Sequence, residues 1–88
     1  MSFHVTWTER ALDDLAQLWL DAEDRDSLAL ASNEIDEFLS ANPHDPTLEV
    51  VSNQGTIMRG PLGVDFWISE ERNRVTVFAA WKAIEDLE

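Results

Sequence analysis

The sequence lacks cysteine and tyrosine, and it has few basic residues for its size. Without cysteine the chain has neither disulfide bonds nor thiolate metal ligands, which fits a reducing compartment. Its 88 residues carry 18 acidic side chains against 6 basic ones, so the formal net charge is −12. Because affinity for nucleic acids requires several Lys or Arg side chains at the phosphates, this charge predicts repulsion of DNA and RNA and attraction of a basic partner.

Long apolar runs are also absent. The first residues, Met1 to Trp7, contain no basic stretch followed by an apolar one, and no segment approaches the length of a membrane span. We therefore expect a cytoplasmic protein with no membrane association. The two histidines, His4 and His44, have no third ligand at a recognisable spacing, so the sequence predicts neither a metal site nor a cofactor. The length predicts a single domain over residues 1–88, because a chain of this size forms one small core.

The clearest structural pattern is an alternation of apolar and polar residues near the C-terminus. Two alternating runs are separated by Glu70-Glu71-Arg72-Asn73, and this pattern predicts a β-hairpin. Since side chains alternate between the faces of a strand, every second residue belongs to the same face. The predicted inner set is Val64, Phe66, Ile68, Val75, Val77, Ala79 and Trp81. The predicted open-face set is Asp65, Trp67, Thr76, Phe78, Ala80 and Lys82.

Helical spacing dominates the first half of the chain. Thr8 offers an N-cap for a first helix from Glu9 to Asp21. The apolar stripe predicted for this helix is Leu12, Leu15, Leu18, Trp19 and Ala22, with Asp14 among the residues facing away. A second helix is predicted from Asp26 to Ala41, with Asp24 or Asp26 as its cap, and the prolines of residues 42–46 end it.

The order of these elements predicts an α+β fold. A strand over Phe3 to Trp7 precedes the helices, and β-favouring segments at Thr47 to Ser52 and Thr56 to Arg59 lead into the hairpin. The short charged link between the helices makes them an antiparallel helical hairpin. We therefore expect an N-terminal strand, two helices, and a three- to four-stranded antiparallel sheet that the helices cover on one face.

In this order of elements the sequence resembles the RelE/ParE superfamily, the toxins of bacterial type II toxin–antitoxin systems. The resemblance rests on the strand that ends in Trp7, then ALDDLAQLWL, EIDEFLSANP and GPLGVDFWI, which leads into RVTVFAAWK. It implies a toxin-like component, of the kind associated with plasmid stabilisation, paired with a cognate antitoxin-like protein. RelE-like members are metal-independent ribonucleases that cut ribosome-bound mRNA, whereas ParE-like members poison DNA gyrase, and both targets stay open.

The resemblance also implies catalytic residues. Ribonuclease members carry Arg and Lys on the open sheet face, so Arg59 and Lys82 are the candidates for binding phosphate and transition-state charge, with His4 for proton transfer. Cleavage through the RNA 2′-hydroxyl needs a base, cations and an acid at one place. The chain has no tyrosine, and its helices are acidic where ribosome-binding members are rich in Lys. Ribonuclease activity is therefore doubtful, and whether the chain is an enzyme stays open.

A partner surface is predicted on the open face of the hairpin. Trp67, Phe78 and Ala80 would form an apolar strip there, and exposed patches of this kind usually mark a contact. The sequence is compatible with three ways of covering this apolar strip: by the C-terminal tail, by a second copy in a homodimer, or by a separate protein such as an antitoxin. The alternative to a toxin is a catalytically silent RelE-fold module that pairs with a basic protein through its acidic helices.

Overall fold

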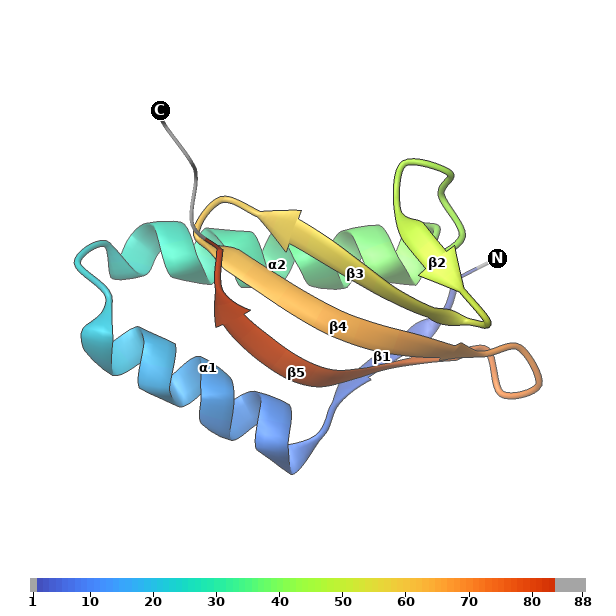
Figure 1. Cartoon of the computed structure of the whole chain (residues 1–88), viewed down its shortest axis with the longest axis horizontal. Helices are drawn as coiled ribbons and strands as arrows, with labels where there is room; N and C mark the ends of the chain where they lie inside the picture. Colours follow the sequence, from blue (N-terminus) through green and yellow to red (C-terminus); the bar gives the residue numbers. More distant parts are fainter. Residues whose placement is uncertain (1, 84–88) are drawn as a thin grey trace.

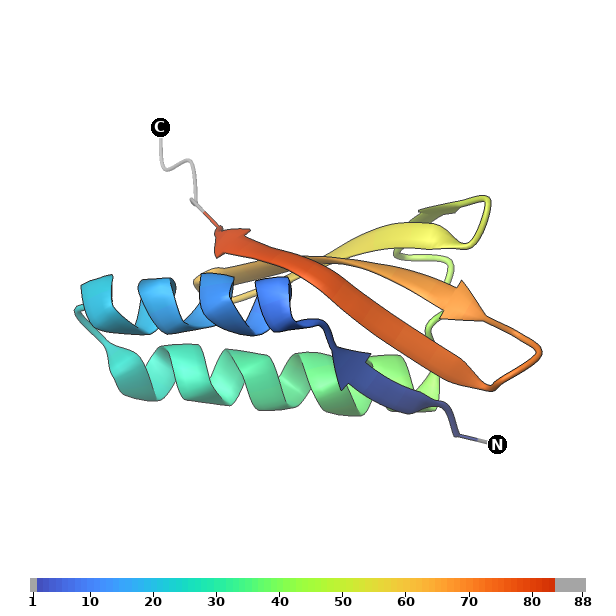
Figure 2. The same ribbon diagram turned by 90° about the horizontal axis from the view of Figure 1, so that it is seen from below.

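The computed structural model describes residues 2–83, in which two helices lie on one face of a five-stranded sheet. Figure 1 shows the sheet in front of α2, and Figure 2 shows both helices beneath it. The elements are β1 (His4–Trp7), α1 (Glu9–Asp21), α2 (Arg25–Ala41), β2 (Glu49–Val51), β3 (Gln54–Arg59), β4 (Leu62–Ser69) and β5 (Arg74–Lys82). No helix among these residues is long and apolar enough to cross a membrane.

The strands follow the order β1-β5-β4-β3-β2. β2 to β5 pair antiparallel, as predicted, and β1 joins the outer edge of β5 in parallel, so the complete sheet is mixed. The parallel pairing follows from the chain path, because β1 and β5 are joined through both helices and the other three strands. The predicted α+β class, with its N-terminal strand, helical pair and antiparallel strands, is confirmed.

Both helices begin where the sequence provides a cap. The Thr8 hydroxyl accepts a hydrogen bond from the Ala11 N–H at 3.1 Å, and the Asp24 carboxylate accepts one from the Ser27 N–H at 3.1 Å. Hydrogen bonds from the hydroxyl and then the N–H of Ser27 hold the pKa of Asp24 below its ordinary value. α1 has the predicted bounds, and α2 begins at Arg25, one residue before the predicted start.

The core lies between the helices and the inner face of β3, β4 and β5. The predicted inward residues of the first alternating run are buried, and so are the first two of the second run. These are Val64, Phe66, Ile68, Val75 and Val77. From the helices, Ala11, Leu28, Ile35 and Leu39 are buried against them. The hairpin prediction is therefore confirmed up to Val77.

A β-bulge interrupts the alternation in β5. Asp65 pairs with Ala79, but the next residue, Phe66, pairs with Val77, so Phe78 has no partner across the ladder. Such an extra residue moves the alternation of the following residues by one position. Odd-numbered residues of β5 therefore face the helices before Phe78, and even-numbered residues face them after it.

The bulge reverses the predicted faces at the end of β5. Ala80 is buried on the helix side, and Trp81 lies on the open side across from Gly63. Lys82 shares the helix side with Ala80. The predictions that Ala79 and Trp81 face the helices, and that Ala80 and Lys82 face away from them, were therefore wrong. The cause is the single inserted residue, which the alternation in the sequence does not reveal.

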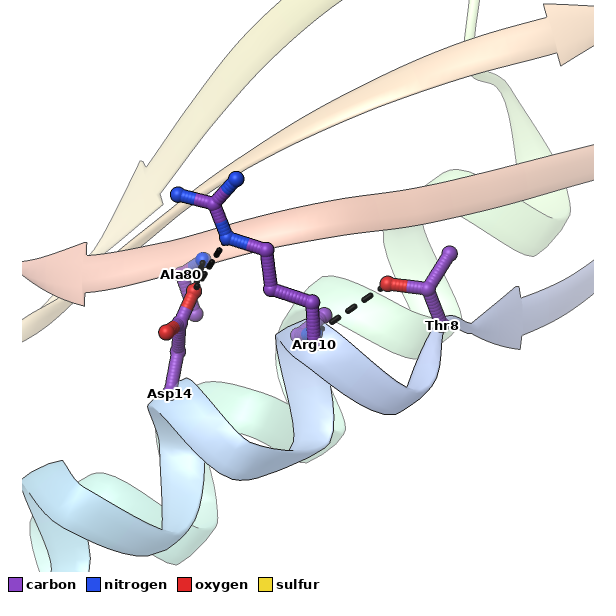
Figure 3. Close-up of polar contacts among 5 residues, drawn as sticks. Thr8, Arg10, Asp14 and Ala80 are labelled. Atoms are coloured by element: carbon purple, nitrogen blue, oxygen red, sulfur yellow. Dashed lines mark hydrogen bonds and ion pairs between the residues drawn. The ribbon is translucent and has the colours of Figure 1, made fainter.

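α1 is also rotated relative to the prediction. Leu12 and Trp19 are 52% and 39% exposed, whereas Ala11 is fully buried. The rotation turns Asp14 towards the sheet, where its carboxylate accepts a hydrogen bond from the Ala80 N–H at 3.2 Å (Figure 3). This bond forms because β1 ends beside Val77 and leaves the outer edge of β5 to α1. The prediction that Asp14 faces away was therefore wrong.

Replacing Phe66 and its neighbour Trp67 separately tests the assignment of the two faces. Phe66→Ala should lower the free energy of unfolding by about 3–5 kcal/mol, because it empties a fully buried site. Trp67→Ala should lower it by about 1 kcal/mol, because that side chain is half-exposed and loses mainly a stacking contact. Equilibrium urea unfolding measures both, and equal losses would contradict the assignment.

A second pair of variants tests the contact between α1 and β5. Asp14→Ala should cost about 1–2 kcal/mol, because the Ala80 N–H loses a charged acceptor. Asp13→Ala removes the same charge from the exposed side of the helix and should change stability by less than about 0.5 kcal/mol. Thermal or urea unfolding provides the comparison. A loss for Asp13→Ala as large as that for Asp14→Ala would show that charge, not the hydrogen bond, sets the effect.

Candidate functional site

The face of the sheet that the helices leave uncovered carries a strip of large apolar side chains. Trp67 of β4 stacks on Phe78 of β5, with ring centroids 4.6 Å apart and ring planes at 25°. Val51 and Met58 extend the strip across β2 and β3 and are 74% and 57% exposed. Trp67, Val51 and Met58 lie on this face because they alternate with buried core residues along their strands, and Phe78 lies there because its ring stacks on Trp67. We call this surface the open face.

Trp81 completes the open face at the end of β5. Met58, Gly63 and Trp81 form one row across three strands, and a Cβ atom on Gly63 would come within 2.6 Å of Cε2 of the Trp81 ring. The indole therefore lies directly on the glycine backbone. A glycine inside a strand often marks such a close approach, so Gly63 was the signal in the sequence that could have placed Trp81 on this face.

Most polar groups on the open face are uncharged, and Glu49 and Asp65 are its two carboxylates among the described strand residues. The Thr56 hydroxyl donates a hydrogen bond to the Asp65 carboxylate at 2.7 Å, and Glu49 is paired with Thr56 on the neighbouring strand. Among the strand residues within 2–83, Arg74 is the single cation on this face. No group of three or more His, Cys, Asp or Glu side chains in the same range could hold a metal ion. The open face is thus built for apolar contact and offers little to an anion.

The structure brings two of the three predicted catalytic residues into one row. Arg59 pairs with Leu62, and Leu62 pairs with Lys82. Adjacent strands lie about 4.8 Å apart, so the Cα atoms of Arg59 and Lys82 are roughly 10 Å apart. Leu62 is fully buried, which places this row on the helix side of the sheet and not on the open face.

Both cations lie on the helix side, in different surroundings. The Arg59 guanidinium carbon lies 4.8 Å from the ring centroid of Phe38 on α2, and its Nη1 donates a hydrogen bond to the carbonyl of Met58 at 2.8 Å. Lys82 lines a cavity with Leu18 and Leu28 of the two helices. These surroundings of Lys82 were not predicted from the sequence, because the prediction assumed an alternation of side chains that the bulge interrupts.

His4 lies far from both cations. It pairs with Arg74 at the opposite end of β5, eight residues from Lys82. A strand rises about 3.3 Å per residue, so His4 is roughly 25 Å from Lys82 along the sheet. The predicted partner residues are arranged differently: Trp67 and Phe78 meet on the open face, and Ala80 is buried beneath it.

Comparison with solved structures identifies this arrangement as the RelE/ParE fold. A chain of the toxin–antitoxin complex RelBE2 from Mycobacterium tuberculosis superimposes with a TM-score of 0.75 at 19% identity, over 94% of this chain and 100% of that one. The isolated RelE toxin of E. coli gives 0.69 at 18% identity, over 97% and 88%. A chain of the chromosomal ParDE system of P. aeruginosa gives 0.55 at 14% identity, over 93% and 97%. No family model matches the sequence, and no curated protein matches it.

These similarities confirm the fold predicted from the resemblance. At identities of 14–19% the agreement concerns the arrangement of helices and strands along nearly the whole chain. It gives no role to any individual side chain. The chemistry of the open face therefore depends on the residues of this chain.

A double-mutant cycle tests the contact between Gly63 and Trp81. Gly63→Ala should lower the free energy of unfolding by about 1–3 kcal/mol, because the added methyl overlaps the indole. In a chain that already carries Trp81→Ala, the same glycine change should have almost no effect, because the overlapping ring is gone. Urea unfolding of the four proteins gives the coupling energy. An equal cost of Gly63→Ala in both backgrounds would place the indole elsewhere.

Proposed function

We propose that this chain is a toxin-like component of a type II toxin–antitoxin pair, and that it works through protein contacts made by its open face. The observation that supports this best is the apolar surface of Trp67, Phe78, Met58 and Trp81, on which Arg74 is the one cation among the described strand residues. Contiguous exposed apolar surface on a sheet is typical of protein-binding sites. The cytoplasm is the proposed place of action.

An antitoxin-like protein is the proposed partner. Two of the structures similar to this chain, RelBE2 of M. tuberculosis and RelBE of E. coli, are toxin–antitoxin complexes. A chain that shares their fold, exposes Trp67 and leaves Phe78 and Trp81 partly exposed beside it is well suited to a stable protein complex. Aromatic residues supply much of the binding energy at such interfaces because they bury a large area at a small cost in conformational entropy.

The geometry argues against RNA cleavage as the activity. A phosphate on the open face would meet Arg74 but neither Arg59 nor Lys82, since those two lie on the helix side. His4 is the nearest imidazole to Arg74, and no second cation stands beside this pair among the described strand residues. Cleavage needs positive charge around the phosphorane as well as proton transfer. Inhibition of a protein target such as gyrase, the ParE-like mode, therefore fits the surface better.

The negative charge of the helices favours a second function. Residues 9–41 hold ten carboxylates and two arginines, and this net charge of −8 accounts for most of the charge of the chain. An acidic layer of this kind attracts basic proteins and steers their approach. The alternative is therefore a catalytically silent RelE-fold module that captures a basic protein. It predicts binding without growth arrest.

Expression in a bacterial host separates these proposals. Induction of the wild-type chain should arrest growth, co-expression of the adjacent reading frame should restore it, and purified protein should inhibit gyrase supercoiling without cutting RNA. Trp67→Ala should relieve the arrest, because it removes the centre of the apolar strip. Lys82→Ala should leave it intact, since that residue lies on the other side of the sheet.

Two outcomes would count against the proposal. The first is RNA cleavage by the purified chain that is lost in Lys82→Ala or Arg59→Gln. This result would support the ribonuclease hypothesis and these two catalytic residues. Normal growth at high expression, with salt-sensitive binding of a basic protein, would support the silent binding module instead. Circular dichroism of each variant verifies that the fold is retained.

A further inference from the structure

A cavity opens at the end of the molecule where the helices extend beyond the sheet. In Figure 1 the link between α1 and α2 projects past the β3–β4 turn and past the end of β5, and Figure 2 shows the same overhang from below. The cavity measures about 830 Å³. Its apolar lining comes from Leu18, Leu28 and Pro61, which belong to the two helices and to the turn. This volume lies within the range of about 300–1,000 Å³ usual for binding pockets.

The rim of this end cavity is acidic. Asp21 lines it from the end of α1, and Glu23 and Asp24 line it from the α1–α2 link; Lys82 is the one cation among the lining residues that the structure describes. Hydrogen bonds from Ser27 lower the pKa of Asp24, so this carboxylate keeps its charge at neutral pH. An apolar floor beneath a net negative rim matches an occupant that combines an aliphatic side chain with a positive charge.

We infer that the end cavity is a docking pocket for a basic segment of the partner protein. A leucine-like side chain fills the floor formed by Leu18, Leu28 and Pro61, and Lys or Arg side chains on the same segment pair with Asp21 and Glu23. The inference rests on the proposed function in taking the occupant to be part of a partner. It adds the chemistry of that partner, and it concerns a surface separate from the open face.

The charges of the chain itself disfavour the other occupants. Residues 84–88 contain Glu85, Asp86 and Glu88, and these carboxylates would meet the acidic rim. A second copy of the chain carries the same net charge of −12. Like charges brought together at an interface oppose binding. A basic partner segment gains from the same field.

Lys82 gives the inference a distinctive signature. Lys82 is among the lining residues of a pocket that we assign to a cationic occupant, so its positive charge opposes binding. Replacing it with alanine should therefore tighten binding. If Lys82 instead served to hold a phosphate, the same replacement would weaken binding of an anionic ligand and leave a basic peptide unaffected.

Amide chemical-shift titrations of the full chain test the pocket. The probe is a short helical peptide of leucine and lysine, compared with a leucine–glutamate peptide and a serine–lysine peptide of equal length. The leucine–lysine peptide should shift the amides of Leu18, Ala22, Gly60 and Ala83, which line the cavity. The leucine–glutamate peptide lacks the charge, and the serine–lysine peptide lacks the apolar anchor, so both should bind far more weakly.

Matched variants assign the contribution of the rim. Asp21→Asn with Glu23→Gln should raise the Kd of the leucine–lysine peptide about tenfold, because two exposed charge pairs are lost. Glu9→Gln with Asp13→Asn changes the net charge equally, away from the cavity, and should alter the Kd by less than about twofold. Lys82→Ala should lower the Kd about threefold.

Several results would overturn the inference. Equal weakening by the two charge-matched pairs, weaker binding after Lys82→Ala, or peptide-induced shifts confined to the open face would each do so. Cavity shifts that grow with protein concentration without peptide would make a second copy the occupant. Another such result is a change in the amide chemical shifts of the cavity residues, on removal of residues 84–88, in the direction opposite to the change caused by the peptide. That result would identify the tail as the occupant. None of these results depends on growth arrest, so the pocket can fail while the proposed function stands.

Discussion

The fold and its surfaces depend on the pairing of β4 with β5. Before the bulge, Val75 and Val77 of β5 complete the core that Val64, Phe66 and Ile68 of β4 begin. At Phe78 the extra residue allows the strand to bury Ala80 and to place Trp81 on the open face, and it leaves the rings of Phe78 and Trp67 in contact. A regular pairing would place Trp81 under the helices, and its indole would have to fit a core that Ala80 now fills. The bulge therefore determines which aromatic rings lie on the open face.

The two sides of the sheet differ in their chemical properties. The open face is aromatic and aliphatic, and the helix layer carries most of the negative charge. Arg59 and Lys82 belong to the helix side, where Arg59 covers Phe38 and Lys82 stands beside an acidic cavity. A protein organised in this way is suited to contact other proteins on two surfaces. It shares the fold of the isolated RelE toxin of E. coli, and Arg74 is the single cation on the open face among the described strand residues.

Local signals in the sequence were sufficient to predict the elements but not every face. Thr8 and the prolines after Ala41 mark helix ends by short-range backbone effects, and the run from Val64 to Ile68 alternates without interruption, so these predictions are confirmed. The bulge at Phe78 depends on how β5 meets both β4 and α1, which a single strand does not encode. The rotation of α1 likewise brings Asp14 to the Ala80 N–H, a contact between residues 66 positions apart that the local helical spacing does not encode. For this reason the elements were predicted well, whereas Lys82 and Ala80 were assigned to the wrong side.

The end of β5 places Trp81 on the open face, against Gly63, and turns Lys82 towards the helices. Nuclear Overhauser contacts of the Trp81 indole in the isotopically labelled chain test this claim most directly. We expect contacts from the ring protons to the Gly63 α-protons and to Met58 on the open face, together with contacts from the Lys82 side chain to Leu28. Contacts from the Trp81 ring to Leu18 or Leu28 would show regular alternation in β5, and they would contradict both the open face and the end cavity as described.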